Sequence, residues 1–276
     1  MANAASTRIA GLIPGDGYVQ SFARGLQVIR SFSAVAPRQT LSDVAARSGL
    51  SRAGARRILL TLEALGYVHS DGKLFSLTPR ILDLGFAYLS SMPIWNLAEP
   101  VMQGLALQVR ESCSAAVLDG HDIVYVLRVS THKIMSISLG VGSRLPAYCT
   151  SMGRMLLSAL SDDAVRMHLT HADLVPRTRF TVTDPAELAA KIAQVRLQGW
   201  SLVNQELEEG MVSMAAPIID RSGHMTAALN ISGQANRTSI KIMQETMLPP
   251  LLAAARSVSQ LLGHVPGGNE PGRALR

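Results

Sequence analysis

The chain has 276 residues, 47% of them hydrophobic and only 4% aromatic, which is enough for two domains with mainly aliphatic cores. The net charge of +6 is uneven, because residues 1–92 hold 10 Lys and Arg against 5 Asp and Glu, while residues 93–276 hold 16 against 15. A basic surplus confined to one part is typical of a surface that contacts nucleic acid. Two cysteines exclude a disulfide framework and favour a reducing cytoplasm, and no apolar run reaches the roughly 18 residues of a membrane span, so we expect no membrane partner.

The first segment, residues 1–17, lacks a charged start followed by a long apolar core, so we expect a flexible arm rather than a signal peptide. A first helix is predicted over residues 19–33. Its inward face is expected to consist of Phe22, Leu26, Ile29 and Phe32.

Two further helices and a tight turn are predicted within residues 40–65. Thr40 and Asp43 have the spacing of a capping box, and Gly49 is a suitable left-handed helix end. Ser51 is a good N-cap for the second helix. At helical spacing, the inward face of that helix is expected to contain Ala55, Ile58, Leu59, Leu62 and Leu65. Leu60 lies on the outward side, where we expect a neighbouring element to cover it.

The outward face of the second helix carries short residues and arginines, which suits a recognition helix in the major groove. After it, Asp71-Gly72 predicts a hairpin turn, and a winged helix-turn-helix over residues 18–78 follows. A solvated surface helix pair is the alternative reading of such a charged face. The candidate DNA contacts are Thr40, Ser42, Ser51, Arg52, Ala53, Arg56, Arg57 and Lys73.

Thr78-Pro79 is typical of a helix start, and we expect a linker helix over residues 79–92. Its apolar face is too large to stand alone in water, so it should pack on its own domain or on a second subunit. That face comprises Ile81, Leu82, Leu84, Tyr88 and Leu89.

A second domain is expected over residues 93–264, with a mostly antiparallel sheet of about six strands and helices packed against it, an α+β arrangement. Residues 142–146 should bend the chain, and Pro249 and Pro250 should interrupt a long C-terminal helix. Residues 265–276, rich in Gly and Pro, predict a disordered tail. The strands are expected at 115–118, 123–130, 134–139, 200–204, 212–219 and 225–231.

Three ordered strings, LPAYCTSMGRMLLSAL, NQELEEGMVSMAAPIID and AALNISG, resemble the IclR family of bacterial transcription regulators. The resemblance covers residues 19–262. FSLTPRILDLGFAYLSS is similar to the branch that controls aromatic-acid degradation through the β-ketoadipate pathway. The resemblance implies a winged helix-turn-helix joined to a GAF-like effector domain, homodimers or homotetramers, operator DNA as partner and no cofactor. In the case of activation, RNA polymerase is a further partner.

The resemblance also implies an effector site. In the family, the backbone turn at the start of the helix after LPxxxT binds a carboxylate, and this turn corresponds to Thr150, Ser151, Met152 and Gly153. Helix N-termini attract anions, so the physical argument agrees. The family often has an acid where this chain has Asn204. The other implied contacts are Asn204, Glu206, Ser213, Asn230 and Ser232.

Two residues are effector candidates on their own chemistry. If the strand around Arg128 is regular, Val124 and Val126 share its side, and an inward arginine is a natural bidentate partner for a carboxylate. An internal salt bridge or a strand end in solvent is the alternative. Tyr148 could stack on an aromatic acid, or serve in ordinary packing.

Other functions stay open at this point. A Gly-x-Ser-x-Gly elbow, a Walker loop and paired CxxC motifs are absent from the sequence. His168 and His171 have the spacing of two metal ligands, but without a third ligand they predict a surface pair. Cys149, next to the expected effector site, would suit a redox-sensing DNA-binding regulator. An enzyme on small acids with an appended DNA-binding module is the third hypothesis. Among effectors, protocatechuate, 4-hydroxybenzoate and β-ketoadipate are equally compatible with the sequence.

Overall fold

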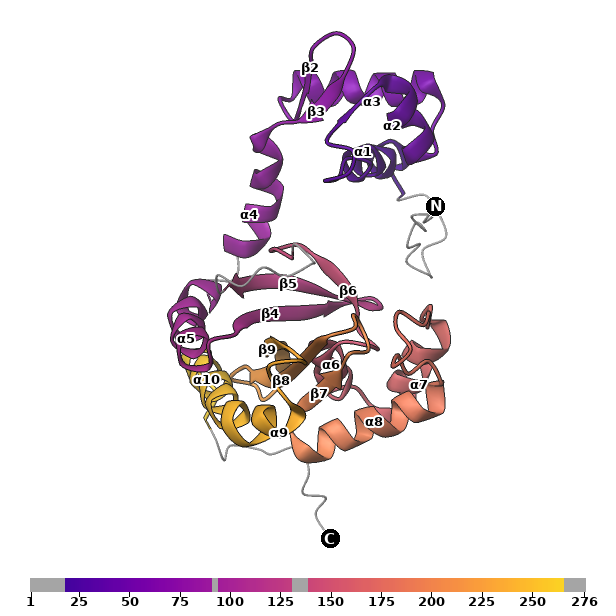
Figure 1. The fold of residues 1–276 in the computed structure, drawn as a ribbon. Coiled ribbons are helices and arrows are strands. Elements are labelled where there is room, and N and C mark those ends of the chain that lie inside the picture. The colour runs from indigo at the N-terminus through magenta and orange to yellow at the C-terminus, as the bar shows by residue number, and fades with distance from the viewer. Residues whose placement is uncertain (1–17, 91–93, 131–138, 266–276) are drawn as a thin grey trace. The chain divides into compact units, whose positions relative to one another are not determined.

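The structure, a computed structural model, describes residues 18–90, 94–130 and 139–265 (Figure 1). The chain divides into two compact units, Met1–Ser91 and Met92–Arg276. Among the described helices, none is both long and apolar enough to cross a membrane. The expected arm over residues 1–17 lies outside the described residues, as does the expected tail from residue 266 onward.

The N-terminal unit is a helical bundle with a small sheet. Its three strands are all antiparallel and lie in the order β1-β3-β2. The sheet includes a strand that the sequence did not predict, β1, which pairs with β3 from a distant part of the chain. The elements are α1 (Gln20–Arg30), β1 (Arg38–Gln39), α2 (Leu41–Ser48), α3 (Arg52–Ala64), β2 (Val68–Ser70), β3 (Phe75–Leu77), a 3₁₀ turn (Pro79–Ile81) and α4 (Leu82–Ser90).

Side-chain caps define α2 and α3, as the sequence predicted. The Thr40 hydroxyl accepts the Asp43 N–H at 3.3 Å, and the Asp43 carboxylate accepts the Thr40 N–H at 3.0 Å. Gly49 ends α2 with φ of 67°, in the left-handed region where glycine is favoured. The Ser51 hydroxyl accepts the Gly54 N–H at 3.2 Å and so begins α3.

The core of this unit differs from the expected pattern at two places. At the C-terminal end of α1, Ile29 and Phe32 pack against the core as expected, and Val28 is fully buried. Phe22 and Leu26 are 68% and 39% exposed, so this half of the expected inward face was wrong. The apolar residues at the end of α1 reach the core, whereas those nearer its start remain exposed. Leu65 is also exposed, because α3 ends at Ala64 and Leu65 is already the C-cap. Leu60 stays exposed among the described residues.

The wing turn is stabilised by Asp71. Its carboxylate accepts the N–H groups of Leu74 and Lys73 at 2.7 and 3.0 Å and pairs with Arg38 of β1. These backbone hydrogen bonds hold the pKa of Asp71 below its usual value. Lys73 is exposed at the tip of the wing, as the sequence predicted.

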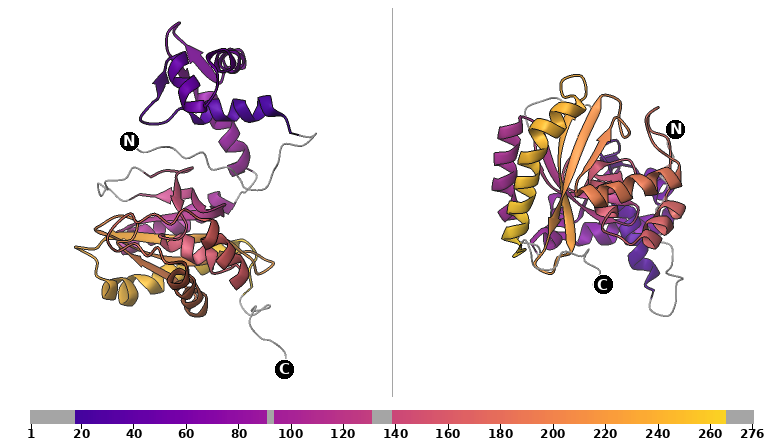
Figure 2. Two further views of the ribbon diagram at one scale, coloured as in Figure 1. Left: turned by 90° about the vertical axis from the view of Figure 1, so that its right-hand side faces the viewer. Right: turned by 90° about the horizontal axis from the view of Figure 1, so that it is seen from below.

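The C-terminal unit is a six-stranded antiparallel sheet in the order β6-β5-β4-β9-β8-β7. Helices α5 and α10 pack against one face and α6 and α8 against the other, which gives three layers (Figure 2). The elements are α5 (Ile94–Val109), β4 (Ser112–Asp119), β5 (Asp122–Val129), β6 (Arg144–Pro146), α6 (Ser151–Leu157), α7 (Asp162–His171), α8 (Pro185–Gln198), β7 (Ser201–Asn204), β8 (Met211–Ile219), β9 (Met225–Gln234), α9 (Ile240–Ile242), a π-helical turn (Met243–Met247) and α10 (Leu248–Leu261).

Two elements depart from the sequence prediction. Residues 144–146, expected as part of a bend, form the edge strand β6 that pairs with β5, while most of the strand expected at 134–139 falls outside the described residues. The interruption of the C-terminal helix is a π-helical turn at Met243–Met247, and Pro249 and Pro250 follow it in the first turn of α10. Proline is tolerated there because the first N–H groups of a helix lack intrahelical partners.

His168 is not part of the predicted surface pair with His171. Its ring meets that of His121 edge to face, with the ring centroids 4.6 Å apart, and so joins α7 to the β4–β5 turn. Burial lowers the pKa of His168 to about 4, and the charge of the nearby His121 is a second, smaller cause. The described residues contain no group of three or more side chains arranged as metal ligands.

Candidate functional site

The corner that leads into α6 is shaped by Thr150 and Gly153. The Thr150 hydroxyl accepts the Gly153 N–H at 3.2 Å and donates to the Pro146 carbonyl at 3.0 Å. Gly153 lies so close to the preceding segment that an added Cβ would stand 2.1 Å from the carbonyl oxygen of Ala147. The Thr150 cap and the close packing of Gly153 therefore hold the first N–H groups of α6, at Ser151 and Met152, in one position.

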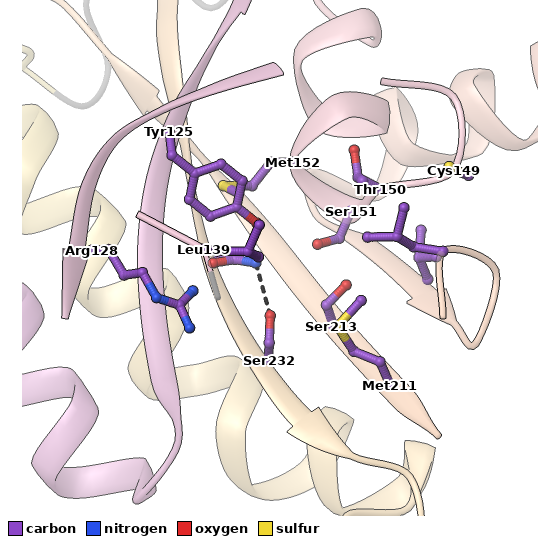
Figure 3. Close-up of a pocket in the computed structure, with 13 residues that line it drawn as sticks. Tyr125, Arg128, Leu139, Cys149, Thr150, Ser151, Met152, Met211, Ser213 and Ser232 are labelled. Atoms are coloured by element: carbon purple, nitrogen blue, oxygen red, sulfur yellow. Dashed lines mark hydrogen bonds between the residues drawn. The ribbon is translucent and has the colours of Figure 1, made fainter. Parts of the chain in front are cut away.

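A pocket lies between this corner and the sheet (Figure 3). Its polar side chains come from the start of α6 and from three strands. Its apolar side chains are spread over α6, β7, β8 and the segments between elements. The lining residues are Tyr125, Arg128, Leu139, Cys149, Thr150, Ser151, Met152, Val203, Leu207, Met211, Ser213, Asn230 and Ser232.

Strand register explains why these residues meet. Val203 lies opposite Ser213 and Ser213 opposite Ser232, so the three side chains share one face of the sheet. On the next strand Ser114 lies opposite Asn230 and faces the same way.

Arg128 reaches the pocket because β5 is irregular. Ala115 pairs with Leu127 and Ala116 with Tyr125, which leaves Val126 as an extra, bulged residue. The bulge changes the alternation, so Arg128 shares its face with Tyr125. The expectation that Val124 and Val126 would share that face was wrong, because it assumed a regular strand.

The polar groups of the pocket are partly connected to one another. Arg128 donates to the hydroxyls of Ser130 at 3.1 Å and Ser114 at 3.3 Å. The Asn230 amide accepts the Ser114 N–H at 3.1 Å and donates to the Ser232 hydroxyl at 3.0 Å.

Ser151 is different. It is 1% exposed, and its hydroxyl has no hydrogen-bond partner among the described residues. A buried hydroxyl without a partner is costly, which makes this atom a candidate to bind a ligand.

Burial raises the pKa of two further groups of the pocket, both of which are neutral near pH 7. It raises the pKa of the Tyr125 phenol to about 12, against the opposing effect of the Arg128 charge. It raises the pKa of the Cys149 thiol to about 11. Because the thiolate is the reactive form, a protonated and fully buried Cys149 gives the redox-sensing hypothesis no support.

Four of the expected effector contacts lie outside this pocket. Tyr148 is buried in the core, where its hydroxyl donates to the Val175 carbonyl, and Gly153 packs on Ala147. Asn204 and Glu206 line a different groove, beside α8, so they do not share one site with Ser151.

Several pocket residues were not expected from the sequence. The missed residues are Tyr125, Leu139, Val203 and Leu207. Val203 lies opposite Ser213, which was expected, so strand pairing would have indicated it. Tyr125 could not be found in this way, because in a regular strand it would face the side opposite to Arg128.

All of the expected DNA contacts except Thr40, which is half-buried, are exposed. Ser42 and Ser51 lie at the starts of α2 and α3, and the exposed face of α3 presents Arg52, Ala53, Arg56 and Arg57. Thr40 is used as a cap, with its hydroxyl bonded to Asp43 at 2.7 Å.

Comparison with known proteins identifies both units. Residues 21–72 match the IclR helix-turn-helix domain, and residues 86–260 match the bacterial transcriptional regulator IclR C-terminal domain. The chain belongs to the IclR family. This assignment confirms the predicted fold, a winged helix-turn-helix followed by an α+β effector domain, and the function of an IclR-family chain is transcription regulation through DNA binding.

Similarity to individual relatives indicates the branch of the IclR family that this chain resembles. The chain is 45% identical to the Pca regulon regulatory protein of Pseudomonas putida, over 93% of this chain and 89% of that protein. A protein of Rhodococcus sp. RHA1 with a crystal structure is 48% identical, with a TM-score of 0.80 over 89% of this chain and 99% of that one. The crystal structure of an IclR homolog from Microbacterium hydrocarbonoxydans, complexed with 4-hydroxybenzoate, has the same fold, with a TM-score of 0.78 at 24% identity over 88% of this chain and 99% of that one.

Proposed function

We propose that this regulator controls genes of aromatic-acid catabolism and that a small carboxylate effector, bound in the α6 pocket, changes its affinity for operator DNA. Likeness to a Pca regulon regulator supports the pathway. The fold shared with an IclR homolog that holds 4-hydroxybenzoate supports the class of effector. The second and third hypotheses, redox sensing and an enzyme, have no comparable support.

The buried Ser151 hydroxyl is the observation that carries the effector site. A carboxylate there would accept hydrogen bonds from this hydroxyl and from the free N–H groups of the first turn of α6. Arg128 would supply the positive charge from the far side of the pocket. The apolar walls at Leu207 and Met211 suit the hydrocarbon body of an aromatic acid.

On the DNA side, the exposed residues of α2, α3 and the wing would contact an operator, with Arg56 and Arg57 on the recognition helix. The regulator would act as a dimer or tetramer, because one operator offers repeated half-sites to paired winged units. An effector changes DNA affinity only through unequal affinity for two arrangements of that assembly. If the effect is activation, RNA polymerase would be a further partner.

The test is fluorescence anisotropy of the purified regulator on the DNA upstream of its own gene, at fixed salt. Protocatechuate, 4-hydroxybenzoate and β-ketoadipate are titrated separately. We expect one acid to change DNA affinity by about tenfold, within the usual range of allosteric coupling. Tight DNA binding without an effect of any acid would remove the aromatic-pathway assignment and leave the DNA-binding function intact.

Ser213→Leu tests the pocket itself. Ser213 is buried in the pocket wall, so a leucine there should occupy the effector volume and abolish the response while DNA affinity stays near normal. Ser257→Leu, at an exposed position of α10, is the matched control and should respond like the unchanged protein. An effector affinity unaffected by Ser213→Leu would mean that the acid binds elsewhere.

A further inference from the structure

The two walls of the α6 pocket are joined by a buried ion pair. Arg154 on α6 donates to the Glu206 carboxylate twice, from Nη1 to Oε1 at 2.7 Å and from Nη2 to Oε2 at 2.6 Å. The two side chains are 3% and 9% exposed. Neither of them lines the pocket.

Arg154 also holds the segment that leads into its own helix. Its Nε donates to the Tyr148 carbonyl at 2.8 Å, so one planar guanidinium bonds the residues before α6 and the loop after β7 together. Ser151 and Met152, which line the pocket, lie in the chain between Tyr148 and Arg154.

Glu206 belongs to a loop that is itself closely held. Its carboxylate accepts the Val182 N–H at 3.1 Å. The preceding residue, Gln205, has φ of 60°, a left-handed conformation that is unfavourable for a residue with a side chain. Its N–H donates to the Met211 carbonyl at 2.7 Å, and its own carbonyl accepts the Thr178 hydroxyl at 2.7 Å.

The residues that follow Glu206 form another wall of the pocket. Leu207 directly follows Glu206, and Met211 accepts the backbone hydrogen bond from Gln205. Both Leu207 and Met211 line the pocket. Movement of Glu206 relative to Arg154 would therefore change the distance between this wall and the start of α6.

Stability alone does not account for such a pair. Replacing a buried ion pair by apolar side chains of similar volume is often neutral or stabilising, because the charges no longer have to be desolvated. A bidentate arginine–carboxylate pair does fix both distance and orientation, which apolar contacts do not.

We propose that Arg154 and Glu206 are positioning residues: together they fix the width of the α6 pocket and so determine which acids fit. This inference rests on the proposed function, in which the pocket binds the effector. Glu206 then acts by holding the pocket wall and does not itself contact the effector. A carboxylate in contact with an anionic effector would repel it, whereas one neutralised by Arg154 does not.

The test replaces the whole pair, in the double variant Arg154→Met with Glu206→Leu. Affinities for 4-hydroxybenzoate and for the larger 6-hydroxy-2-naphthoate are measured by calorimetry. In the unchanged protein we expect a preference for the smaller acid, and in the double variant a fall of about tenfold in that preference, the scale of discrimination that pocket shape provides. If the pair were merely structural, its loss would lower the affinity for both acids alike and leave the ratio of the two affinities unchanged.

Two further variants complete the design. Arg154→Lys keeps the charge but replaces the planar guanidinium by a single nitrogen, which cannot form the bidentate pair. It should therefore show a smaller fall in preference, and it carries the test if the double variant does not fold. The control pair, Asp162→Leu with Arg196→Met, removes another arginine–carboxylate contact of this unit, 2.6 Å long, that does not line the pocket. We expect it to leave the preference unchanged.

Hydrogen exchange supplies a measurement that needs no ligand. In the variants of the pair, amides of residues 151–153 and 207–211 should exchange faster, while the midpoint of urea unfolding stays close to that of the control. Unchanged exchange at both walls together with an unchanged preference would overturn the proposal. If the unchanged protein bound neither acid, the proposed effector class would fail, and exchange alone would still decide whether the pair positions the walls.

Discussion

Gly153 has no space for a side chain, and this gives a prediction at the scale of one residue. In Gly153→Ala the new methyl group would collide with backbone atoms of Ala147, so α6 and the segment before it must separate. We expect the free energy of unfolding to fall by about 1–3 kcal/mol, the usual cost of overpacking. Urea unfolding measures this, and effector affinity should fall in the same variant.

Gly104→Ala is the matched control. Gly104 lies within α5, and nothing stands within 4 Å of an added Cβ. Alanine is the better helix former by up to about 1 kcal/mol, so this variant should be unchanged or slightly more stable. Equal losses in the two variants would contradict the close packing of α6 on Ala147.

Residue by residue, the sequence identified part of the pocket. Ser151, Met152, Ser213 and Ser232 were expected from family strings, and the structure brings them to one pocket. Arg128 was also expected, but on the assumption of a regular strand. A bulge depends on the pairing partner as well as on the strand itself, so its position could not be read from local residues.

At the scale of one element, α3 carries the prediction about DNA. Arg56→Ala and Arg57→Ala each remove a charge from its exposed face, so each should weaken DNA binding and reduce by about one the slope of log affinity against log salt. Anisotropy titrations at several salt concentrations measure both quantities. Effector affinity should stay unchanged, because both residues lie in the N-terminal unit.

Arg24→Ala is the control for these variants, since Arg24 is exposed on α1, outside the helix-turn-helix. We expect it to affect DNA binding less than either change on α3. If neither Arg56 nor Arg57 mattered, α3 would not be the recognition helix.

Elements with local signals were predictable and elements with distant partners were less so. The start of α2 follows from Thr40 and Asp43, which bond one another within four residues. Strand β1 has only two residues and exists because β3 lies beside it, so no pattern within it indicates a strand. The buried side of α1 depended in the same way on where its neighbours packed.

At the scale of the whole molecule, the exposed apolar face of α4 leads to a prediction about assembly. Leu82 and Phe86 are 70% and 68% exposed in the single chain, more than is usual for large apolar side chains of a linker. We expect a second copy to cover them. Leu82→Glu combined with Phe86→Glu should lower the oligomeric state, as measured by sedimentation velocity.

The control for this pair is Leu197→Glu with Met167→Glu, two exposed apolar residues of the C-terminal unit that lie on α8 and α7. Retention of the unchanged oligomer by the α4 variant would show that this face is not an interface. Loss of assembly in both variants would indicate a general effect of added charge.

The α+β class and the antiparallel sheet were predictable from the order of strands, helices and turn residues along the chain. The spatial order β6-β5-β4-β9-β8-β7 was not, because it joins β4 to β9 across more than half of the unit. Such long-range pairing is decided by the packing of the complete sheet.

The bulge at Val126 also bears on how relatives of this protein are compared. In a regular strand, residues three apart face opposite sides, and here Tyr125 and Arg128 face the same pocket only because of one extra residue. A relative that lacked this residue would turn its counterpart of Arg128 toward α5, even with an arginine at the aligned position. The charge of the pocket can therefore change during evolution by insertion or deletion of a single residue, without any substitution at position 128.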